Sequence, residues 1–178
     1  KNSDKIPNKN IKKIGKKVLF FHILDTLKKS NIFEKIIINT DSNKIKNLSS
    51  SRYGNWIQVN NRPTHLIGDY VPMNEIINYD LYDFSDDQVF LQTHSTNPFL
   101  STRTILDSVK LYNKKTKYDN YDSLFSVNLI KSRLYNEKLR PINLNPKILG
   151  RTQDLSGVYE ENSNIYIFTK SSFIKNKK

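Results

Sequence analysis

A short basic segment at the start of the chain carries residue types that could bind phosphate. Residues 1–10 (KNSDKIPNKN) combine lysines with polar side chains and precede a helix-like pattern. Backbone N–H groups and lysine side chains in such a loop can surround phosphate oxygens. The segment lacks the glycine-rich pattern of a Walker loop, so on composition alone a solvated basic terminus is the better interpretation.

Three further polar residues lie in predicted loops. Arg62 offers fixed donors that suit phosphate oxygens or the edge of a base, although a surface arginine in a turn is the more ordinary interpretation. Asp69 could orient loop backbone or bind nucleotide hydroxyls, and Asp41 more simply caps the following helix. The chain contains no cysteine, which excludes disulfides, thiolate metal sites and cysteine nucleophiles.

The elements that must position these residues alternate between strand-length apolar runs and helix-period segments. Apolar residues recur at Phe20, Ile23, Leu24 and Leu27, a spacing typical of an amphipathic helix. Predicted helices span residues 18–29, 73–81 and 101–112, and predicted strands span residues 35–40, 56–60, 88–93, 123–129 and 164–169. This order predicts an α/β fold with three α/β/α layers and a mostly parallel sheet.

Ligands of such sheets bind beyond the carboxyl ends of the strands. We therefore expect the loops at residues 1–10, 40–42, 60–69 and 93–98 to carry the function. A chain of 178 residues fits one domain. The irregular stretch 132–154 is predicted to be a lid or a dimerisation arm.

The formal net charge of +12 suits a polyanionic partner such as a nucleotide or nucleic acid. The lysines are scattered, however, and the chain contains no alanine, so compositional bias is the better explanation. No apolar run approaches the roughly 20 residues of a membrane helix. We expect a cytoplasmic protein without a membrane or nucleic-acid partner. A basic nucleic-acid-binding module remains as an alternative, with the 10 tyrosines and 9 phenylalanines as stacking groups.

Six short motifs follow one another along nearly the whole chain in the order found in one enzyme family. Ser3, Pro7, Lys9 and Asn10 match the spacing of its loop R-x-x-S-x-x-(I/V)-P-x-K-N. Residues 39–41 (NTD) resemble S-T-D, and residues 62–69 (RPTHLIGD) resemble R-P-x-x-L-x-x-D. Residues 95–99 (STNPF), 151–155 (RTQDL) and 161–167 (ENSNIYI) resemble P-T-S-P-(L/F), R-(R/x)-Q-D-L and E-N-G-x-x-Y-I. The chain thus resembles the acylneuraminate cytidylyltransferases.

The resemblance implies a Rossmann-like nucleotidyltransferase fold and a reaction with CTP. The anomeric hydroxyl of a sialic-acid-like nonulosonic acid attacks the α-phosphate, and pyrophosphate leaves, with Mg²⁺ offsetting the developing charge. Lys9 and Ser3 would hold the triphosphate, with Asn10, Arg62 and Asp69 near the nucleotide. Lys9 and Arg62 are the candidate catalytic residues.

The resemblance also predicts residues that bind the sugar acid. Arg151 and Gln153 would lie near its carboxylate, but Thr152 stands where relatives often carry a second arginine. Asn97 belongs to the P-T-S-P-like motif. The preceding glutamine of the family aligns with His94 when no gap is allowed, and with Gln92 when one residue is inserted; a loop histidine without a role is an equal alternative.

Two parts of the family pattern are not within these residues. The family's first strand would precede Lys1, and its pair of metal-binding aspartates would follow Lys178. We therefore expect a chain truncated at both ends, with no metal site of its own. The resemblance implies a homodimer. Another sugar nucleotidyltransferase and a degenerate, noncatalytic relative remain as alternatives.

Overall fold

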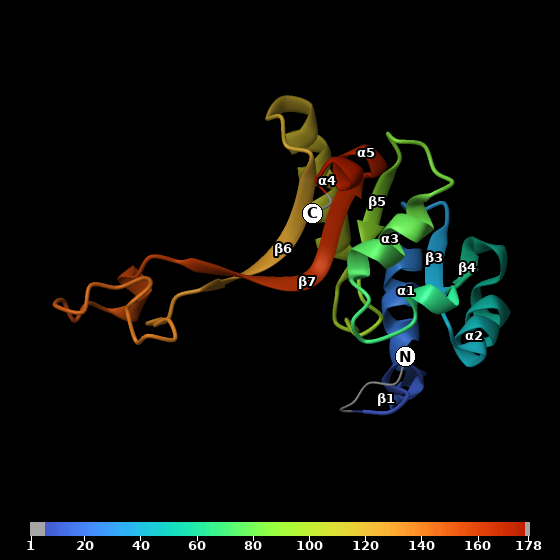
Figure 1. Ribbon diagram of the computed structural model, residues 1–178, viewed down its shortest axis with the longest axis horizontal. Coiled ribbons are helices and arrows are strands. Elements are labelled where there is room, and N and C mark those ends of the chain that lie inside the picture. Colours follow the sequence, from blue (N-terminus) through green and yellow to red (C-terminus); the bar gives the residue numbers. More distant parts are fainter. Residues whose placement is uncertain (1–5, 177–178) are drawn as a thin grey trace.

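Two separate sheets form the centre of the molecule (Figure 1). In the computed structural model, which describes residues 6–176, β3 (Ile36–Thr40) and β4 (Ile57–Asn61) form a parallel pair. The second sheet has the order β5 (Val89–Gln92), β7 (Val158–Thr169) and β6 (Ser123–Ile130), with both pairings antiparallel. A small hairpin of β1 (Lys13–Ile14) and β2 (Lys17–Val18) leads into the first helix.

Helices surround both sheets. The α-helices are α1 (Leu19–Ser30), α2 (Asn43–Tyr53), α3 (Met73–Leu81), α4 (Thr102–Tyr118) and α5 (Lys170–Asn176). Single 3₁₀ turns are η1 (Lys9–Ile11), η2 (Gly54–Trp56), η3 (Thr64–Leu66) and η4 (Thr152–Asp154). Side-chain caps start two of the helices: Ser42 accepts a hydrogen bond from the Ile45 N–H, and Ser101 accepts one from the Thr104 N–H.

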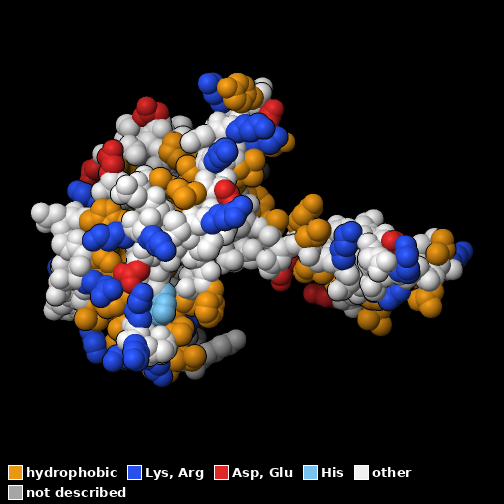
Figure 2. All heavy atoms as spheres, turned by 180° about the vertical axis from the view of Figure 1, so that it is seen from behind, with side chains coloured by type: hydrophobic (Ala, Val, Ile, Leu, Met, Phe, Trp, Pro, Cys, Tyr) orange, Lys and Arg blue, Asp and Glu red, His pale blue; other side chains and the backbone are white. Residues whose placement is uncertain are grey.

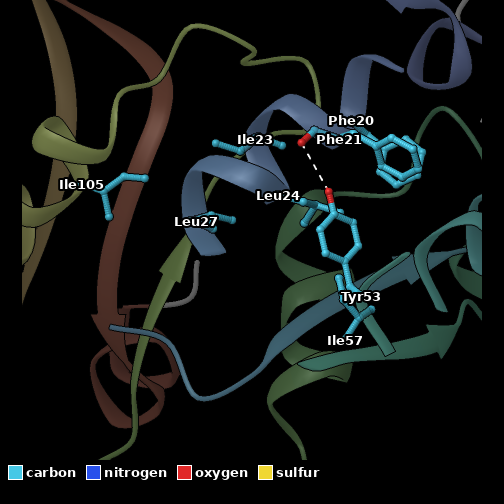
Figure 3. Packing of buried hydrophobic residues seen from close by; sticks show 8 residues of the cluster. All are labelled: Phe20, Phe21, Ile23, Leu24, Leu27, Tyr53, Ile57 and Ile105. Atoms are coloured by element: carbon cyan, nitrogen blue, oxygen red, sulfur yellow. Dashed lines mark hydrogen bonds between the residues drawn. The ribbon is translucent and has the colours of Figure 1, made fainter. Parts of the chain in front are cut away.

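The apolar face of α1 forms the larger core cluster. Its phenylalanines and aliphatic residues pack against Tyr53 of α2, Ile57 of β4 and Ile105 of α4 (Figure 3). Ile105 is completely buried, and the Tyr53 hydroxyl donates to the Phe21 carbonyl over 3.4 Å. The spacing that predicted this helix therefore also explains its packing, because residues three and four apart share one face.

The two faces of the antiparallel sheet are covered by different helices. Tyr112 of α4 packs on Ile165 and Ile167, whose side chains lie on one face of β7. On the other side the rings of Phe90 and Phe168 lie between further aromatic rings, Phe84 after α3 and Phe173 of α5. Successive strand residues point to opposite faces, so the layers are helix, sheet and helix.

A cavity of about 620 Å³ separates β3 from β5. Among residues 6–176 no backbone ladder joins these two strands. The apolar lining comes from α1 and from α3 with the turn after it: Phe20, Ile23, Leu24, Leu27, Ile76, Ile77, Leu81 and Phe84. Residues 36–40 of β3 and residues 89–92 of β5 also line the cavity.

The strand pairing is more mixed than the expected mostly parallel sheet. Strand β7 lies between β5 and β6 and runs antiparallel to both, so the only parallel ladder among the described residues is β3–β4. The reason is the chain path, since β6 and β7 follow each other through an excursion rather than through a crossover helix.

That excursion is an arm. Residues 131–157 leave the end of β6, extend far from the rest of the molecule and return into β7 (Figures 1 and 2). Large apolar side chains on it are exposed, with Leu139 at 80% and Leu149 at 91%. Figure 2 also shows lysine and arginine side chains spread over this face of the molecule. No helix among the described residues combines the length and apolarity needed to cross a bilayer.

Candidate functional site

Polar residues gather at one end of the cavity, where three strands end. Thr40 closes β3, Arg62 follows β4, and residues 92–95 end β5 and begin the next loop. Asn10, from the 3₁₀ turn η1, lines the same cavity. The site therefore lies beyond the carboxyl ends of strands, where the sequence predicted it.

The guanidinium of Arg62 is held by Asn39, the residue before the end of β3. Its Nε donates to the Asn39 side-chain oxygen over 2.7 Å, and its terminal nitrogen donates to the Asn39 carbonyl over 3.1 Å. The backbone N–H of Arg62 also bonds to the Thr40 carbonyl over 3.1 Å, which continues the β3–β4 pairing past the strand. A guanidinium has five donors, so several remain for a ligand.

Asp80 of α3 lines the same cavity and completes this network. Its Oδ1 accepts hydrogen bonds from the amides of Asn39 over 2.8 Å and Asn60 over 2.7 Å. Burial raises the pKa of Asp80 above its usual value, against the opposing effect of the two amides and the Arg62 charge. The site thus holds an acidic group close to its arginine.

Three buried polar atoms at and beside this end have no hydrogen-bond partner among the described residues. They are the side-chain oxygens of Asn10 and Thr93 and the side-chain nitrogen of Asn97. Buried polar atoms are nearly always paired, because an unpaired one costs about 1–3 kcal/mol. Asn10 and Thr93 line the cavity, so a polar ligand there can supply their missing bonds.

His94 also lines the cavity, half-buried after β5. Burial lowers its pKa, so the imidazole is neutral at pH 7 and can both donate and accept a hydrogen bond. Its carbonyl accepts the Asn97 N–H over 3.1 Å and shapes the turn. Gln92 lies two residues earlier and lines the cavity too, so the structure brings both candidates to the site.

The other predicted nucleotide residues are distributed less tightly. Lys9 is half-buried in the turn η1, directly before Asn10, and Asn8 opens that turn with a left-handed φ of 54°. Asp69 is exposed and is not among the residues that line the cavity. Ser3 lies outside the described residues.

Two of the residues predicted to bind the sugar acid lie on the arm. Arg151 and Gln153 are exposed beside and within η4. The Arg151 guanidinium pairs with Asp154 over 2.8 Å, and the Gln153 carbonyl accepts from Lys131 over 3.1 Å. The structure therefore does not bring these two residues to the cavity of their own chain (Figure 1).

Sequence reasoning did not single out Asp80, and it assigned no individual role to Asn39, Asn60 or Thr93, although these three belong to a family motif or to predicted functional loops. Asp80 carried a signal, because it falls four residues after Ile76 on the apolar face of the predicted helix. An acidic residue at such a position is unusual and points to a partner inside the fold. Asn39 and Asn60 gave a weaker signal, as amides at the ends of apolar strands.

The described residues do not form a metal site by themselves. Among residues 6–176 no group of three or more His, Cys, Asp or Glu side chains lies close enough together to hold a metal ion. Three carboxylates line the cavity, those of Glu34, Asp41 and Asp80, and Asp80 is already bonded to two amides. A divalent ion would therefore need ligands from a bound phosphate or from elsewhere.

Comparisons with known proteins agree on one kind of enzyme. The family model described as cytidylyltransferase matches residues 1–177. An N-acylneuraminate cytidylyltransferase of Escherichia coli O18:K1:H7 is 30% identical over 111 residues, which are 62% of this chain and 26% of that protein. N-acylneuraminate cytidylyltransferase A of Danio rerio is 27% identical over 178 residues, covering 96% of this chain and 39% of that protein. The chain thus spans well under half the length of these curated relatives.

Two solved structures share the fold at low identity. A CMP:2-keto-3-deoxy-manno-octonic acid synthetase complexed with CTP has a TM-score of 0.67 at 10% identity, covering 97% of this chain and 72% of that one. A 4-diphosphocytidyl-2C-methyl-D-erythritol synthase from Anaerococcus prevotii has a TM-score of 0.63 at 15% identity, covering 92% of this chain and 66% of that one. The expected α/β nucleotidyltransferase fold is confirmed.

Proposed function

The chain belongs to the cytidylyltransferase family, and from that premise we propose that it transfers CMP from CTP to a sialic-acid-like nonulosonic acid. The oxygen of the anomeric hydroxyl attacks the α-phosphorus of CTP. The bond from that phosphorus to the oxygen that bridges to the β-phosphate breaks, and pyrophosphate leaves. The hydroxyl proton passes to solvent or to a base, so the products are a CMP-sugar and pyrophosphate.

One observation carries this proposal: residues from three separate family motifs meet at one cavity. Asn10 comes from the first loop, Arg62 from the R-P motif and Ser95, directly after His94, from the P-T-S-P-like motif, and all of them line it. Such a meeting is expected when the motifs bind one nucleotide and its acceptor. The unpartnered oxygens of Asn10 and Thr93 support it, because a polar ligand in the cavity would supply their hydrogen bonds.

In this proposal the nucleotide occupies the side of Asn10 and Arg62. The remaining donors of the Arg62 guanidinium bind phosphate oxygens or the cytosine edge, and Lys9 and Ser3 bind the triphosphate. Asp69 would bind a nucleotide hydroxyl or order its loop. Phosphoryl transfer depends mainly on positioning and on cations. Mg²⁺ would enter with the phosphates of CTP, since the described residues supply no ligand set for it.

The sugar acid would bind on the side of β5. His94, Gln92 and Asn97 offer neutral donors and acceptors for its hydroxyls. Arg151 and Gln153 lie on the arm, away from their own cavity (Figure 1), so we propose that they reach the cavity of a second subunit in a homodimer. The exposed apolar residues of the arm support this, because large apolar side chains in such a patch favour an interface.

The test, made with the natural full-length protein, is release of pyrophosphate from CTP and Mg²⁺ with one acid at a time: N-acetylneuraminate, legionaminate, pseudaminate or 3-deoxy-octulosonate. We expect release with one acid, lost in Lys9→Ala and retained in Lys12→Ala, which removes an exposed lysine three residues later. Absence of release with every acid, together with no CTP binding by calorimetry, would reject the proposal.

A cytidylyltransferase with a different acceptor is the second candidate. The two solved structures with this fold carry the names of enzymes for other acceptors. Release with 3-deoxy-octulosonate alone would select this candidate. A preference for UTP over CTP would count against both.

A further inference from the structure

We propose that Asp80 is a positioning residue that fixes the Arg62 guanidinium for nucleotide binding, acting through the side-chain amide of Asn39. This inference rests on the proposed function for its consequence and on the hydrogen-bond geometry for its mechanism. None of the six motifs contains Asp80, which lies on α3 between the second and third of the strands that end at the cavity.

The orientation of the Asn39 amide links the two charged groups. Arg62 can only donate, so the amide oxygen of Asn39 must face its Nε, at 2.7 Å. The amide nitrogen then points the other way and donates to Asp80 over 2.8 Å. A carboxylate can only accept, so the arginine and the aspartate together permit one of the two amide orientations.

Asn60 secures the position of Asp80. Its amide nitrogen donates to the same Asp80 oxygen over 2.7 Å. Asn60 pairs with Asn39 in the β3–β4 ladder, so the two amides extend from neighbouring strands toward one carboxylate on α3. The carboxylate therefore connects the helix to both strands immediately before the Arg62 loop.

Asp80 lies among apolar residues of α3, so packing alone does not explain why an aspartate stands at this position. The neighbouring residues of α3 that line the cavity are the apolar Ile76, Ile77 and Leu81. A half-buried carboxylate at such a position loses hydration and destabilises the fold unless other groups compensate. Burial indeed raises the pKa of Asp80, with Asn60, Asn39 and the Arg62 charge acting in the opposite direction. The negative charge of Asp80 is thus balanced by the Arg62 guanidinium, and the Asn39 side-chain amide lies between the two groups.

Loss of the Asp80 charge should release the amide and the guanidinium. In Asp80→Asn the side chain keeps its size, but the new amide can donate as well as accept. Asn39 keeps its oxygen toward Arg62, but its nitrogen no longer donates to a charged acceptor, so the amide is held less firmly and in turn holds the guanidinium less firmly. Arg62 would lose its fixed direction, and its remaining donors would no longer be preorganised for a nucleotide.

A double-mutant cycle tests the link through CTP affinity. We expect Asp80→Asn to raise the dissociation constant for CTP about tenfold, as expected for disturbing one charge-assisted hydrogen-bond arrangement. In an Arg62→Ala background the same change should have no further effect. Asp83→Asn, which removes the same charge from an exposed position two residues after α3, should leave affinity unchanged. An equal loss with and without Arg62 would overturn the inference.

A second readout does not depend on CTP. In ¹⁵N-labelled protein the Arg62 Nε–H signal should exchange with water about tenfold faster in Asp80→Asn than in the unmodified protein or in Asp83→Asn. An unchanged exchange rate would overturn the inference even if CTP binds. If the unmodified protein shows no CTP binding, the proposed function fails while this exchange measurement still decides the role of Asp80. If Asp80→Asn does not fold, Asn39→Ser breaks the same link and should give the same acceleration.

Discussion

Replacement of Arg62 by lysine is the most informative change at the site. The guanidinium uses one nitrogen on the Asn39 side chain, at 2.7 Å, and a second on the Asn39 carbonyl, at 3.1 Å. Arg62 also lines the cavity, so we expect its other donors to be available to a ligand there. Arg62→Lys keeps the charge and much of the side-chain length, so it isolates the role of the planar, forked geometry.

The size of the effect follows from the number of tasks that the side chain performs. A lysine ammonium is a single point of contact, so it can bond to Asn39 or to the nucleotide but cannot hold both in fixed directions. One hydrogen bond to a charged group is therefore lost on binding, at about 1.5–3 kcal/mol. That loss corresponds to a dissociation constant for CTP that is roughly 10- to 150-fold larger.

Calorimetric titration with CTP measures this difference directly. Arg103→Lys is the matched control, because Arg103 is 91% exposed on α4 and its ion pair with Asp107 lies on the surface. Melting temperatures of both variants should stay close to that of the unmodified protein. If Arg62→Lys bound CTP within twofold of the unmodified protein, the guanidinium would not hold the nucleotide and the reasoning would be wrong.

Three further predictions concern stability and assembly. Burial lowers the pKa of His94, so the unfolded chain binds a proton at this residue more readily than the folded protein does. The free energy of unfolding should therefore be unaffected by His94 above about pH 6.5 and should fall as the pH drops through that value toward the folded pKa. Urea unfolding from pH 8 to pH 5 should show this fall in the unmodified protein, and His94→Gln should reduce it. Ile105→Ala removes most of a completely buried side chain and should lower the free energy of unfolding by about 2–5 kcal/mol in the same assay; a loss below about 0.5 kcal/mol would show that the core at α4 is not packed as described. Replacing residues 132–154 with a short Gly-Ser linker should convert the expected dimer to a monomer in light scattering while CTP binding persists, and an unchanged mass would remove the arm from the interface.

Local sequence patterns predicted several helices and strands correctly, because the spacing of apolar residues indicates which face of an element is buried. The β-branched run Ile36–Ile38 forms the first three residues of β3, and the helix periodicity around Phe20 corresponds to α1. Strand β7 was predicted only from residue 164, yet it begins at Val158. Residues 159–163 (YEENS) are polar and mostly exposed, and they are held in the strand by pairing with β6, which no local pattern contains.

The candidate site could be predicted only where motifs supplied it. Arg62 and His94 meet at the cavity because they follow strands whose ends the fold brings together, while Gln92 ends β5 and Asn10 comes from the turn η1. Asp80 could not be assigned from motifs, since its role depends on the side-chain orientations of Asn39 and Asn60. Arg151 and Gln153 lie on the arm, so their role stays a prediction that depends on a second subunit.

The cavity between β3 and β5 also has a consequence for how the two sheets can be extended. The β3–β4 pair and the β5–β7–β6 sheet share no backbone ladder among the described residues, so what joins them is side-chain packing by helices such as α1. The backbone N–H and C=O groups at these facing strand edges can therefore pair with another strand. Such a strand would lie against the apolar residues of α1 and α3 that line the cavity, and it would join the two sheets into one.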